Sequence, residues 1–241
     1  MARALARGWG EPVLCSDHGS GRATALVDEL GGEALSNVEV ARRADMVVLC
    51  HKPNQLEAVA SELRDEVKAV VSILGATPTE DLKRAYPNTP VMRMMPNTPV
   101  EVRRGVTCYA RTPAVDPQLE AEVVGLFERL GAVIPLDESL IEAATAISGV
   151  GPAYQALLAE AQVDAAVRHG LAAPLAGRLV TETMAGSAAL LLERDCDTLA
   201  VRREVASPGG STARGLAALE RGGVRRAFQD AIDAVISWSA R

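Results

Sequence analysis

Aromatic residues, cysteines and histidines are all scarce in this sequence of 241 residues. Aromatic side chains make up only 3% of it, so we expect no stacking surface for the bases of a nucleic acid. The four cysteines and three histidines are widely spaced and include no Cys-x-x-Cys pair, which favours buried thiols over a disulfide framework or a zinc site. The sequence therefore predicts neither a nucleic-acid-binding protein nor a metalloenzyme.

Long apolar runs and an excess of positive charge are lacking as well. No run approaches the roughly 20 apolar residues that cross a bilayer, and Arg3, Arg7 and Glu11 interrupt the stretch where a signal peptide would have its apolar core. The net charge of −6 and the isoelectric point near 5.2 argue against an anionic membrane or a nucleic acid as partner. We expect a cytoplasmic protein.

The first half of the chain alternates short apolar runs with helical patterns, which predicts an α/β domain with a parallel sheet and right-handed crossovers. Thr77-Pro78-Thr79-Glu80 predicts a capping box at the start of a helix, and Asp116-Pro117 predicts a second capped start. Strands are expected near residues 47–49, 70–74, 91–95 and 106–109, and helices near residues 56–63, 81–85 and 117–130.

The second half has no strand signal and is rich in alanine and leucine. Helices are expected over residues 140–147, 152–169, 174–194 and 223–239. Helices with so many apolar and small residues must bury much of their surface, and about 100 residues favour a bundle shared between subunits. We therefore expect two domains, an α/β domain over residues 1–137 and an all-helical oligomerisation domain over residues 138–241, joined into a homodimer or a higher homo-oligomer.

Three short motifs could carry chemistry, and each also has a purely structural explanation. Met95-Pro96-Asn97-Thr98-Pro99 follows a strand, where open α/β sheets bind ligands, but it could be a rigid turn. Residues 148–154, Ser-Gly-Val-Gly-Pro-Ala-Tyr, could bring the backbone close to a ligand or simply connect two helices. Residues 207–212, Ser-Pro-Gly-Gly-Ser-Thr, open a helix and could bind an anion or form an ordinary capped turn.

Together these motifs resemble the pyrroline-5-carboxylate reductase family, whose members carry Val-Lys-Pro, Met-Pro-Asn-Thr-Pro, Ser-Gly-Ser-Gly-Pro-Ala-Tyr and Ser-Pro-Gly-Gly-Thr-Thr in this order. The first counterpart here is His51-Lys52-Pro53, and the resemblance extends over nearly the whole chain to Leu219-Glu220-Arg221-Gly222-Gly223. The departures are His51 for an aliphatic residue, Val150 for a serine, Leu74-Gly75-Ala76 for Ala-Ala-Gly, and Arg202-Arg203-Glu204 for Lys-Asp-Asn.

The resemblance implies a Rossmann-type domain and the transfer of a hydride from NADPH, or from NADH, to the C5=N bond of a cyclic imine, which gives proline. It implies that Thr212 hydrogen-bonds near the imine nitrogen and that the loop beginning at Ser207 holds the substrate carboxylate through the amides of Gly209, Gly210, Ser211 and Thr212. No acid–base pair is evident, and a protonated imine is electrophilic enough for orientation and electrostatics to supply much of the catalysis.

The same resemblance assigns cofactor contacts to the first domain. Ser16 and Asn37 match positions that contact the 2′-phosphate of NADPH, although helix or turn capping explains them equally well. Asp17 could instead favour the free 2′-hydroxyl of NADH. The residues expected along the ribose and nicotinamide are Lys52, Pro53, Gly75, Ala76 and Asn97. Without the resemblance, Lys52 would be taken for a surface lysine.

The start of the chain departs most from this pattern. Met1 to Gly8 resemble the helix that follows the G-x-G-x-x-G loop, so a central strand and that loop, about ten residues in all, are expected to be missing. The neighbouring strands would then keep unpaired edges. Either the start lies at an internal methionine or the protein is truncated and impaired in cofactor binding.

Two rival functions follow from the same features. A β-hydroxyacid dehydrogenase shares the architecture but needs a catalytic lysine on the helix after Gly151, and that helix contains none through Val167. A non-catalytic dimeric scaffold of the same fold, which would not bind NADPH, is the alternative from a different class.

Overall fold

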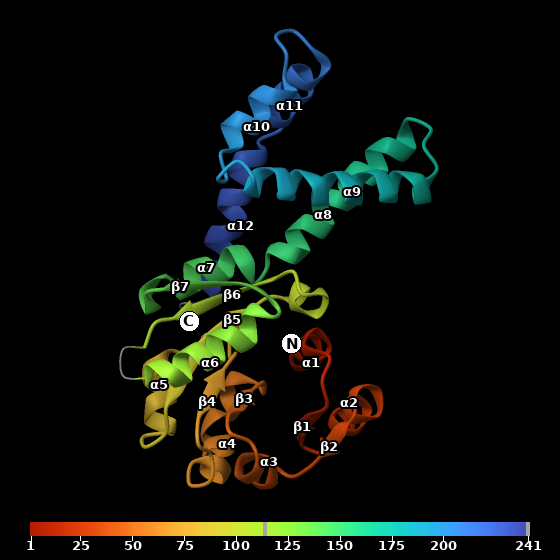
Figure 1. The fold of residues 1–241 in the computed structure, drawn as a ribbon. Helices are drawn as coiled ribbons and strands as arrows, with labels where there is room; N and C mark the ends of the chain where they lie inside the picture. Colours follow the sequence, from red (N-terminus) through yellow and green to blue (C-terminus); the bar gives the residue numbers. More distant parts are fainter. Residues whose placement is uncertain (113–114, 240–241) are drawn as a thin grey trace. The chain divides into compact units, whose positions relative to one another are not determined.

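A computed structural model describes residues 1–112 and 115–239 (Figure 1). The chain divides into two compact units, and each is described by itself. The first unit comprises Met1–Pro152 together with the end of the chain from Ile236, and the second comprises Ala153–Val235. Among the described residues, no helix has the length and apolar character that crossing a membrane requires.

The first unit is the α/β domain that the sequence predicts. Its strands are β1 (Val13–Cys15), β2 (Gly32–Ala34), β3 (Val47–Leu49), β4 (Val70–Ser72), β5 (Val91–Pro96), β6 (Gly105–Ala110) and β7 (Gly131–Leu136). Its helices are α1 (Ala2–Trp9), α2 (Arg22–Leu30), α3 (Asn37–Arg43), α4 (Leu56–Leu63), α5 (Thr79–Ala85), α6 (Pro117–Glu128) and α7 (Ile141–Ser148), with short 3₁₀ helices η1 (Pro53–Gln55), η2 (Thr98–Val102) and η3 (Glu138–Leu140).

The larger sheet has the strand order β3-β4-β5-β6-β7. The first three of these strands are parallel, as expected, but β6 runs antiparallel to β5. The connection between β5 and β6 comprises only residues 97–104. A parallel crossover needs a dozen or more residues, so this short connection forces the chain to turn back. Our expectation of a uniformly parallel sheet is wrong at this strand.

Strands β1 and β2 form a separate two-stranded parallel sheet (Figure 1). Val13, Leu14 and Cys15 pair with Gly32, Glu33 and Ala34. Within residues 1–112 and 115–239, neither β1 nor β3 pairs with a strand along its second edge. The sheet of this unit is therefore divided between β1 and β3.

Apolar side chains alternate between the two faces of the larger sheet, as the period of two in a strand requires. Val71 and Met92 belong to a buried cluster that includes Leu5 of α1 and Phe127 of α6. The next residue back along β4, Val70, belongs to a second cluster with side chains of α4 and α5. Helices thus cover both faces, which explains why β4 and β5 are buried along their whole length.

Helix α1 lies against η2 because its glycine allows the two backbones to meet. A Cβ atom on Gly8 would lie 2.2 Å from the carbonyl oxygen of Val100. The Arg103 Nε donates a hydrogen bond of 2.7 Å to the Gly8 carbonyl, and the Trp9 indole donates one of 3.0 Å to the carbonyl of Leu126. The 3₁₀ helix that holds α1 contains Thr98 and Pro99 of the first motif.

One predicted helix start is confirmed and the other is wrong. The Asp116 side chain accepts hydrogen bonds from the first turn of α6. Helix α5, in contrast, begins at Thr79 without a cap from Thr77, whose hydroxyl bonds to the Gly75 carbonyl. The amide of Thr79 donates instead to Glu138, a residue distant in sequence. Local spacing could not reveal this acceptor.

The second unit is all-helical, as predicted. It contains most of α8 (Gly151–Arg168), α9 (Ala173–Leu192), α10 (Thr198–Val205), α11 (Ser211–Arg221) and the first part of α12 (Val224–Ser239). Helix α10 was not expected. Ala176 is the one fully buried residue among those described in this unit. Its exposed apolar side chains include Leu157, Leu175, Leu179, Leu192, Leu199, Val205 and Leu219.

Candidate functional site

The residues predicted to contact a cofactor lie at the carboxyl ends of parallel strands in the first unit. Ser16 follows β1, Lys52 and Pro53 follow β3, Gly75 and Ala76 follow β4, and Asn97 follows β5. Because β3, β4 and β5 are hydrogen-bonded and parallel, their carboxyl ends lie side by side at one end of the sheet. Open α/β sheets bind ligands at this end.

Ser16 and Asn37 lie together, although they are 21 positions apart in the sequence. The Ser16 hydroxyl donates a hydrogen bond of 2.5 Å to the Asn37 Oδ1, and the Asn37 Nδ2 donates one of 2.8 Å to Glu62. Helix α3 is capped by Ser36 and Glu39, which form a reciprocal capping box. Helix capping therefore does not account for the side chain of Asn37.

The carboxylate of Asp17 organises the loop between β1 and α2. It accepts hydrogen bonds from the amides of Gly19, Ser20 and Ala23 and from the hydroxyl of Ser20. These bonds, led by the Ala23 amide, lower the pKa of Asp17 to about 2. The carboxylate is therefore ionised at neutral pH, and both its oxygens are engaged by the loop.

His51 precedes Lys52 at the carboxyl end of β3. Its Nδ1 lies 2.9 Å from the Lys52 carbonyl oxygen, so Nδ1 carries the proton that forms this hydrogen bond. Burial lowers the pKa of His51, with a smaller opposing effect from that bond. The imidazole is consequently neutral at pH 7 and helps to hold the backbone that presents Lys52 and Pro53.

Ala76 adopts a backbone conformation that favours glycine. Its φ angle is +50°, in the left-handed region. The family pattern has glycine at this position, so the departure noted in the sequence introduces a small strain here, on the order of 1 kcal/mol. Ala76 and Pro53 line the same cavity of about 380 Å³, together with Glu57, Asp81 and Arg84 among others.

Asn97 joins the first motif to the second. Its side chain is buried, its Nδ2 donates a hydrogen bond of 3.0 Å to the Ser148 carbonyl, and its Oδ1 accepts one of 2.8 Å from the Val106 amide. Ser148 is also close to Cys108, with 3.4 Å between their side-chain Oγ and Sγ atoms. Both polar groups of Asn97 are therefore used within the protein, and they attach the end of α7 to the end of β5.

An ionic cluster around a buried arginine, which the sequence did not indicate, also involves β5. Arg93 of β5 is only 2% exposed, and it contacts Glu138 at 2.7 Å and Glu142 at 2.6 Å. Glu138 also accepts hydrogen bonds from the amide and the hydroxyl of Thr79. The sequence feature that could have indicated this cluster is that Arg93 is the single charged residue in the predicted strand 91–95.

The substrate-binding residues predicted from the third motif belong to the second unit. Gly209 has a φ of +73°, so the tight turn depends on this glycine, and a Cβ atom on Gly210 would lie 2.6 Å from the Ser207 hydroxyl, which would have to rotate away. Helix α11 begins at Ser211, and no side chain caps it among the described residues. The free amides at this helix start, with the Thr212 hydroxyl beside them, are suited to an anion.

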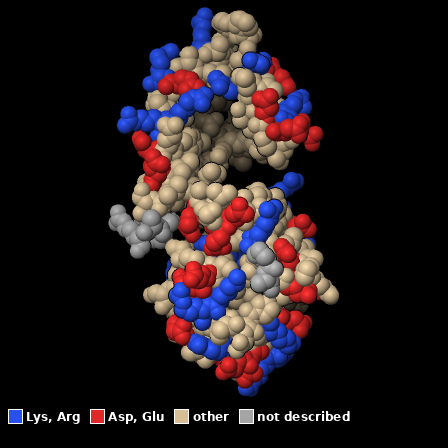
Figure 2. Space-filling model, turned by 90° about the vertical axis from the view of Figure 1, so that its left-hand side faces the viewer, with Lys and Arg blue, Asp and Glu red and all other residues tan. Residues whose placement is uncertain are grey.

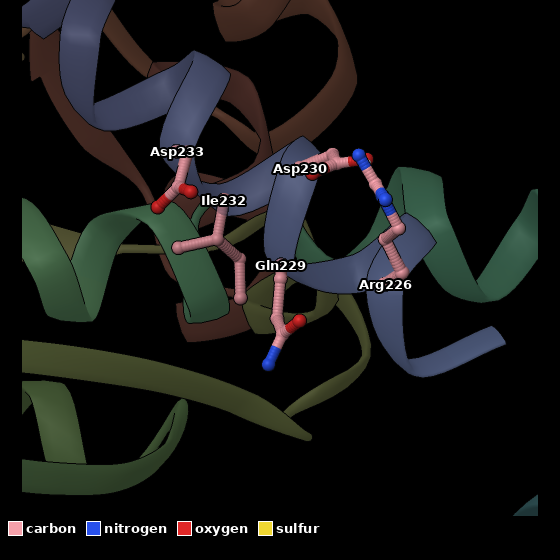
Figure 3. A pocket seen from close by; sticks show the side chains of 5 residues that line it. All are labelled: Arg226, Gln229, Asp230, Ile232 and Asp233. Carbon is pink, nitrogen blue, oxygen red and sulfur yellow. The ribbon is translucent and has the colours of Figure 1, made fainter. Parts of the chain in front are cut away.

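A hollow in the second unit lies away from this loop. It measures about 630 Å³ and is lined by Arg226, Gln229, Asp230, Ile232 and Asp233 of α12 (Figure 3). Arg226 and Asp230 form an ion pair of 3.5 Å. Because all lining residues come from one helix, the hollow is an uncovered face of α12.

Figure 2 shows that basic and acidic side chains are interspersed over the visible face of the molecule.

Comparison with known proteins gives two family matches. Residues 138–241 match a family model described as pyrroline-5-carboxylate reductase dimerisation. Residues 1–75 match one described as NADP oxidoreductase, coenzyme F420-dependent.

Curated relatives extend the likeness over most of the chain. The pyrroline-5-carboxylate reductase of Mycobacterium tuberculosis is 38% identical over 90% of this chain and 83% of its own length. That of Pseudomonas aeruginosa is 34% identical over 95% of this chain and 86% of its own length.

Solved structures agree. Pyrroline carboxylate reductase from Plasmodium falciparum with NADP bound has a TM-score of 0.87 at 28% identity, and the alignment covers 98% of this chain and 92% of that one. The enzyme from Streptococcus pyogenes has a TM-score of 0.90 at 27% identity, with coverage of 99% and 94%. Prephenate dehydrogenase from Aquifex aeolicus, at 12% identity and a TM-score of 0.53, shares the fold alone.

Proposed function

The chain belongs to the pyrroline-5-carboxylate reductase family, and on this premise we propose how its residues carry out the family's reaction. It is an NAD(P)H-dependent oxidoreductase that reduces the C5=N bond of 1-pyrroline-5-carboxylate to give L-proline. The observation that carries this conclusion is the 38% identity to a curated reductase over 90% of the chain.

Residues at the carboxyl edge of the sheet would hold the cofactor, which supplies the hydride when it is bound. Lys52 and Pro53 would contact it after β3, and Gly75 and Ala76 after β4. Two observations support this fit. Pro53 and Ala76 line one cavity, and the His51 bond fixes the backbone carbonyl next to them. Asn97 would contribute through the strand end that its side chain stabilises, since both polar groups of that side chain are engaged.

NADPH is the preferred cofactor in this proposal. A carboxylate at the end of β1 selects NADH when it can accept a hydrogen bond from the free 2′-hydroxyl. Here both oxygens of Asp17 are engaged by loop amides and by Ser20. Ser16 and Asn37 lie together beside that loop, and the exposed Arg22 begins α2 with a positive charge. The engaged carboxylate of Asp17 and the positive charge of Arg22 favour a 2′-phosphate, whereas both polar groups of Asn37 are already used by Ser16 and Glu62.

The loop before α11 would bind the substrate. Its carboxylate would accept hydrogen bonds from the amides at the start of α11, with Gly209 and Gly210 leaving room for it. The Thr212 hydroxyl would hydrogen-bond near the imine nitrogen. The protonated imine is already electrophilic, so this chain needs to orient it and exclude water rather than supply a strong acid.

A homodimer completes the second unit in this proposal. Helices α8 and α9 contribute one buried residue and several exposed leucines. An exposed apolar face of this kind is stable in water only when another surface covers it. A second copy is the fitting occupant, because the dimerisation family model matches the segment that carries these helices.

The role of Thr212 is tested by comparing Thr212→Ala with the wild-type protein in an assay of NADPH oxidation dependent on pyrroline-5-carboxylate. We expect kcat/KM to fall by about 5- to 150-fold, the range of about 1–3 kcal/mol for a lost hydrogen bond in the transition state. Thr212→Ser should recover most of the activity because it keeps the hydroxyl.

Thr198→Ala is the matched control, since Thr198, like Thr212, lies in the first turn of a helix of the same unit but is exposed. Its kinetics should equal those of the wild type. Unchanged kinetics in Thr212→Ala would reject the assignment of this residue. A wild-type protein that neither binds NADPH nor oxidises it would favour the scaffold function instead.

A further inference from the structure

Strand β5 holds both ends of α7. At the first end, the Arg93 guanidinium spans the gap between the strand and the segment that leads into the helix, and it reaches Glu138 of η3 and Glu142 of α7. At the second end, Asn97 donates its hydrogen bond to the carbonyl of Ser148, the last residue of α7. The same six-residue strand thus contributes one attachment directly and the other through the residue that follows it.

The first turns of α7 also pack on the sheet through apolar side chains. Ile141 is fully buried, and it forms a cluster with Met95, Cys108 and Ala110, which Ala144 joins from the next turn. Helix α7 is therefore a fixed part of the first unit, and the chain leaves that unit after Pro152. The glycines of the second motif, Gly149 and Gly151, lie between the fixed helix and that exit.

The Arg93 cluster has properties of a rigid attachment rather than of a surface ion pair. The guanidinium is 2% exposed, so removing its partners would leave a charge buried without compensation. Glu138 connects a third element by accepting hydrogen bonds from the amide and hydroxyl of Thr79 at the start of α5. Burial raises the pKa of Glu138, but the hydrogen bonds from Thr79 and Arg93 lower it overall, and the carboxylate stays ionised.

We propose that Arg93 is a positioning residue of the reductase, which fixes α7 on the sheet and so determines where the Ser148–Gly151 turn lies relative to the end of β5. This inference rests on the proposed function, because the turn and the strand end carry two of the family's motifs. Neither Arg93 nor its two carboxylates has a role in the chemistry. A displacement of about 1 Å at a reacting centre can cost on the order of 100-fold in rate, so a loosened α7 should lower kcat.

The test uses a variant that removes the cluster without leaving a buried charge. Arg93→Met, Glu138→Gln and Glu142→Gln are combined in the full-length chain, which keeps the approximate volumes and an acceptor for Thr79. We expect this triple variant to bind NADPH nearly as well as the wild type, to show a kcat lower by about 10- to 100-fold, and to exchange the amide hydrogens of residues 141–148 faster.

Lys68→Met is the matched control. It also removes a cation from an ion pair of the first unit, because Lys68 lies 2.9 Å from Asp45. That pair is exposed and lies before the amino ends of β3 and β4, whereas Arg93 holds α7. Its kcat and its exchange in α7 should equal those of the wild type. A triple variant that folds and keeps both the wild-type kcat and the wild-type exchange in α7 would overturn the proposal.

If the triple variant does not fold, Arg93→Lys decides the question, since lysine keeps the charge but cannot reach both carboxylates with a planar fork. A lower kcat with faster exchange in α7 would support the positioning role, and wild-type values of both would reject it. Failure of the proposed function would look different. A wild-type protein without reductase activity would contradict the proposed function. Amide hydrogen exchange of residues 141–148 would still show whether Arg93 holds α7.

Discussion

The two units of the molecule bury their apolar side chains to very different extents. The first unit contains three clusters of buried residues, with side chains such as Phe127 and Leu82 fully enclosed. Among the described residues of the second unit, Ala176 alone is fully buried. The α/β unit therefore carries its own core, whereas the helical unit has almost none among its described residues, as expected if the proposed homodimer covers it. Cofactor binding and assembly should respond to mutation separately.

The largest effect is expected from charging the uncovered face of the helical unit. Leu175 and Leu179 are one turn apart on α9 and each is 50% exposed. Changing both to glutamate should dissociate the proposed homodimer, because fully burying an exposed leucine side chain contributes about 1.5–3 kcal/mol and a charged side chain there would oppose burial. Sedimentation measures the assembly, and NADPH titration should show that the first unit still binds its cofactor.

The matched control is Arg178→Gln on the same helix, where an exposed polar residue replaces an exposed charge. It should leave the dimer intact. A double leucine variant that stays dimeric would refute the role of this face, and one that loses cofactor binding as well would refute the independence of the two units.

Two glycines of the first unit should respond in opposite directions to alanine. Gly8→Ala places a Cβ atom 2.2 Å from the Val100 carbonyl oxygen, so it should destabilise the protein by about 1–3 kcal/mol as α1 moves away from η2. Gly125→Ala on α6 meets no atom within 4 Å and should stabilise it by about 0.5–1 kcal/mol. Urea unfolding measures both. Equal effects would show that α1 is not closely packed.

Ala76→Gly should stabilise the first unit by about 1 kcal/mol or less, because glycine adopts the left-handed conformation without strain. Thermal unfolding checks the sign. Gly75→Ala serves as the control. Because Gly75 has no positive φ, exchanging alanine and glycine there should not show the strain-related difference in stability expected at Ala76. A destabilising Ala76→Gly would mean that loop entropy outweighs the backbone strain.

The smallest effect concerns pH. Hydrogen bonds lower the pKa of Asp17 to about 2 in the folded state, below the value of about 3.9 expected in the unfolded chain. The resulting stabilisation is complete above about pH 4 and is lost as the pH falls towards 2. Asp17→Asn should therefore be less stable than the wild type at pH 7, with a difference that shrinks between pH 4 and pH 2.

Asp28→Asn, an exposed substitution on the adjacent helix α2, provides the comparison for Asp17. Unfolding free energies of the three proteins across this pH range are the measurement. A difference for Asp17→Asn that stays constant down to pH 2 would contradict the proposed hydrogen bonds.

Periodicity was sufficient to locate most elements. The short apolar runs at residues 70–74 and 91–95 predicted β4 and β5, and the helical spacing after residue 150 predicted α8, α9 and α12. Such patterns report which face of an element is buried, and this is a local property. The family motifs located the strand ends of the first unit and the start of α11 in the second unit, and the structure has these elements at those positions.

Long-range pairings could not be read from the sequence. The direction of β6 is the exception, because the predicted strands at residues 91–95 and 106–109 already leave too few residues between them for a parallel crossover. Glu138 caps α5 and binds Arg93 across 59 and 45 positions, and no spacing rule relates residues so far apart. Asn97 seemed a ligand contact from its motif, whereas its side chain is engaged by Ser148 and Val106.

The most direct test of the central claim is the stoichiometry of the reaction with the wild-type chain. Purified protein is mixed with NADPH and pyrroline-5-carboxylate, and NADPH consumption and proline formation are followed together. We predict saturable NADPH oxidation with one proline formed for each NADPH consumed. Protein that is folded and dimeric but forms no proline would contradict the assignment of reductase activity.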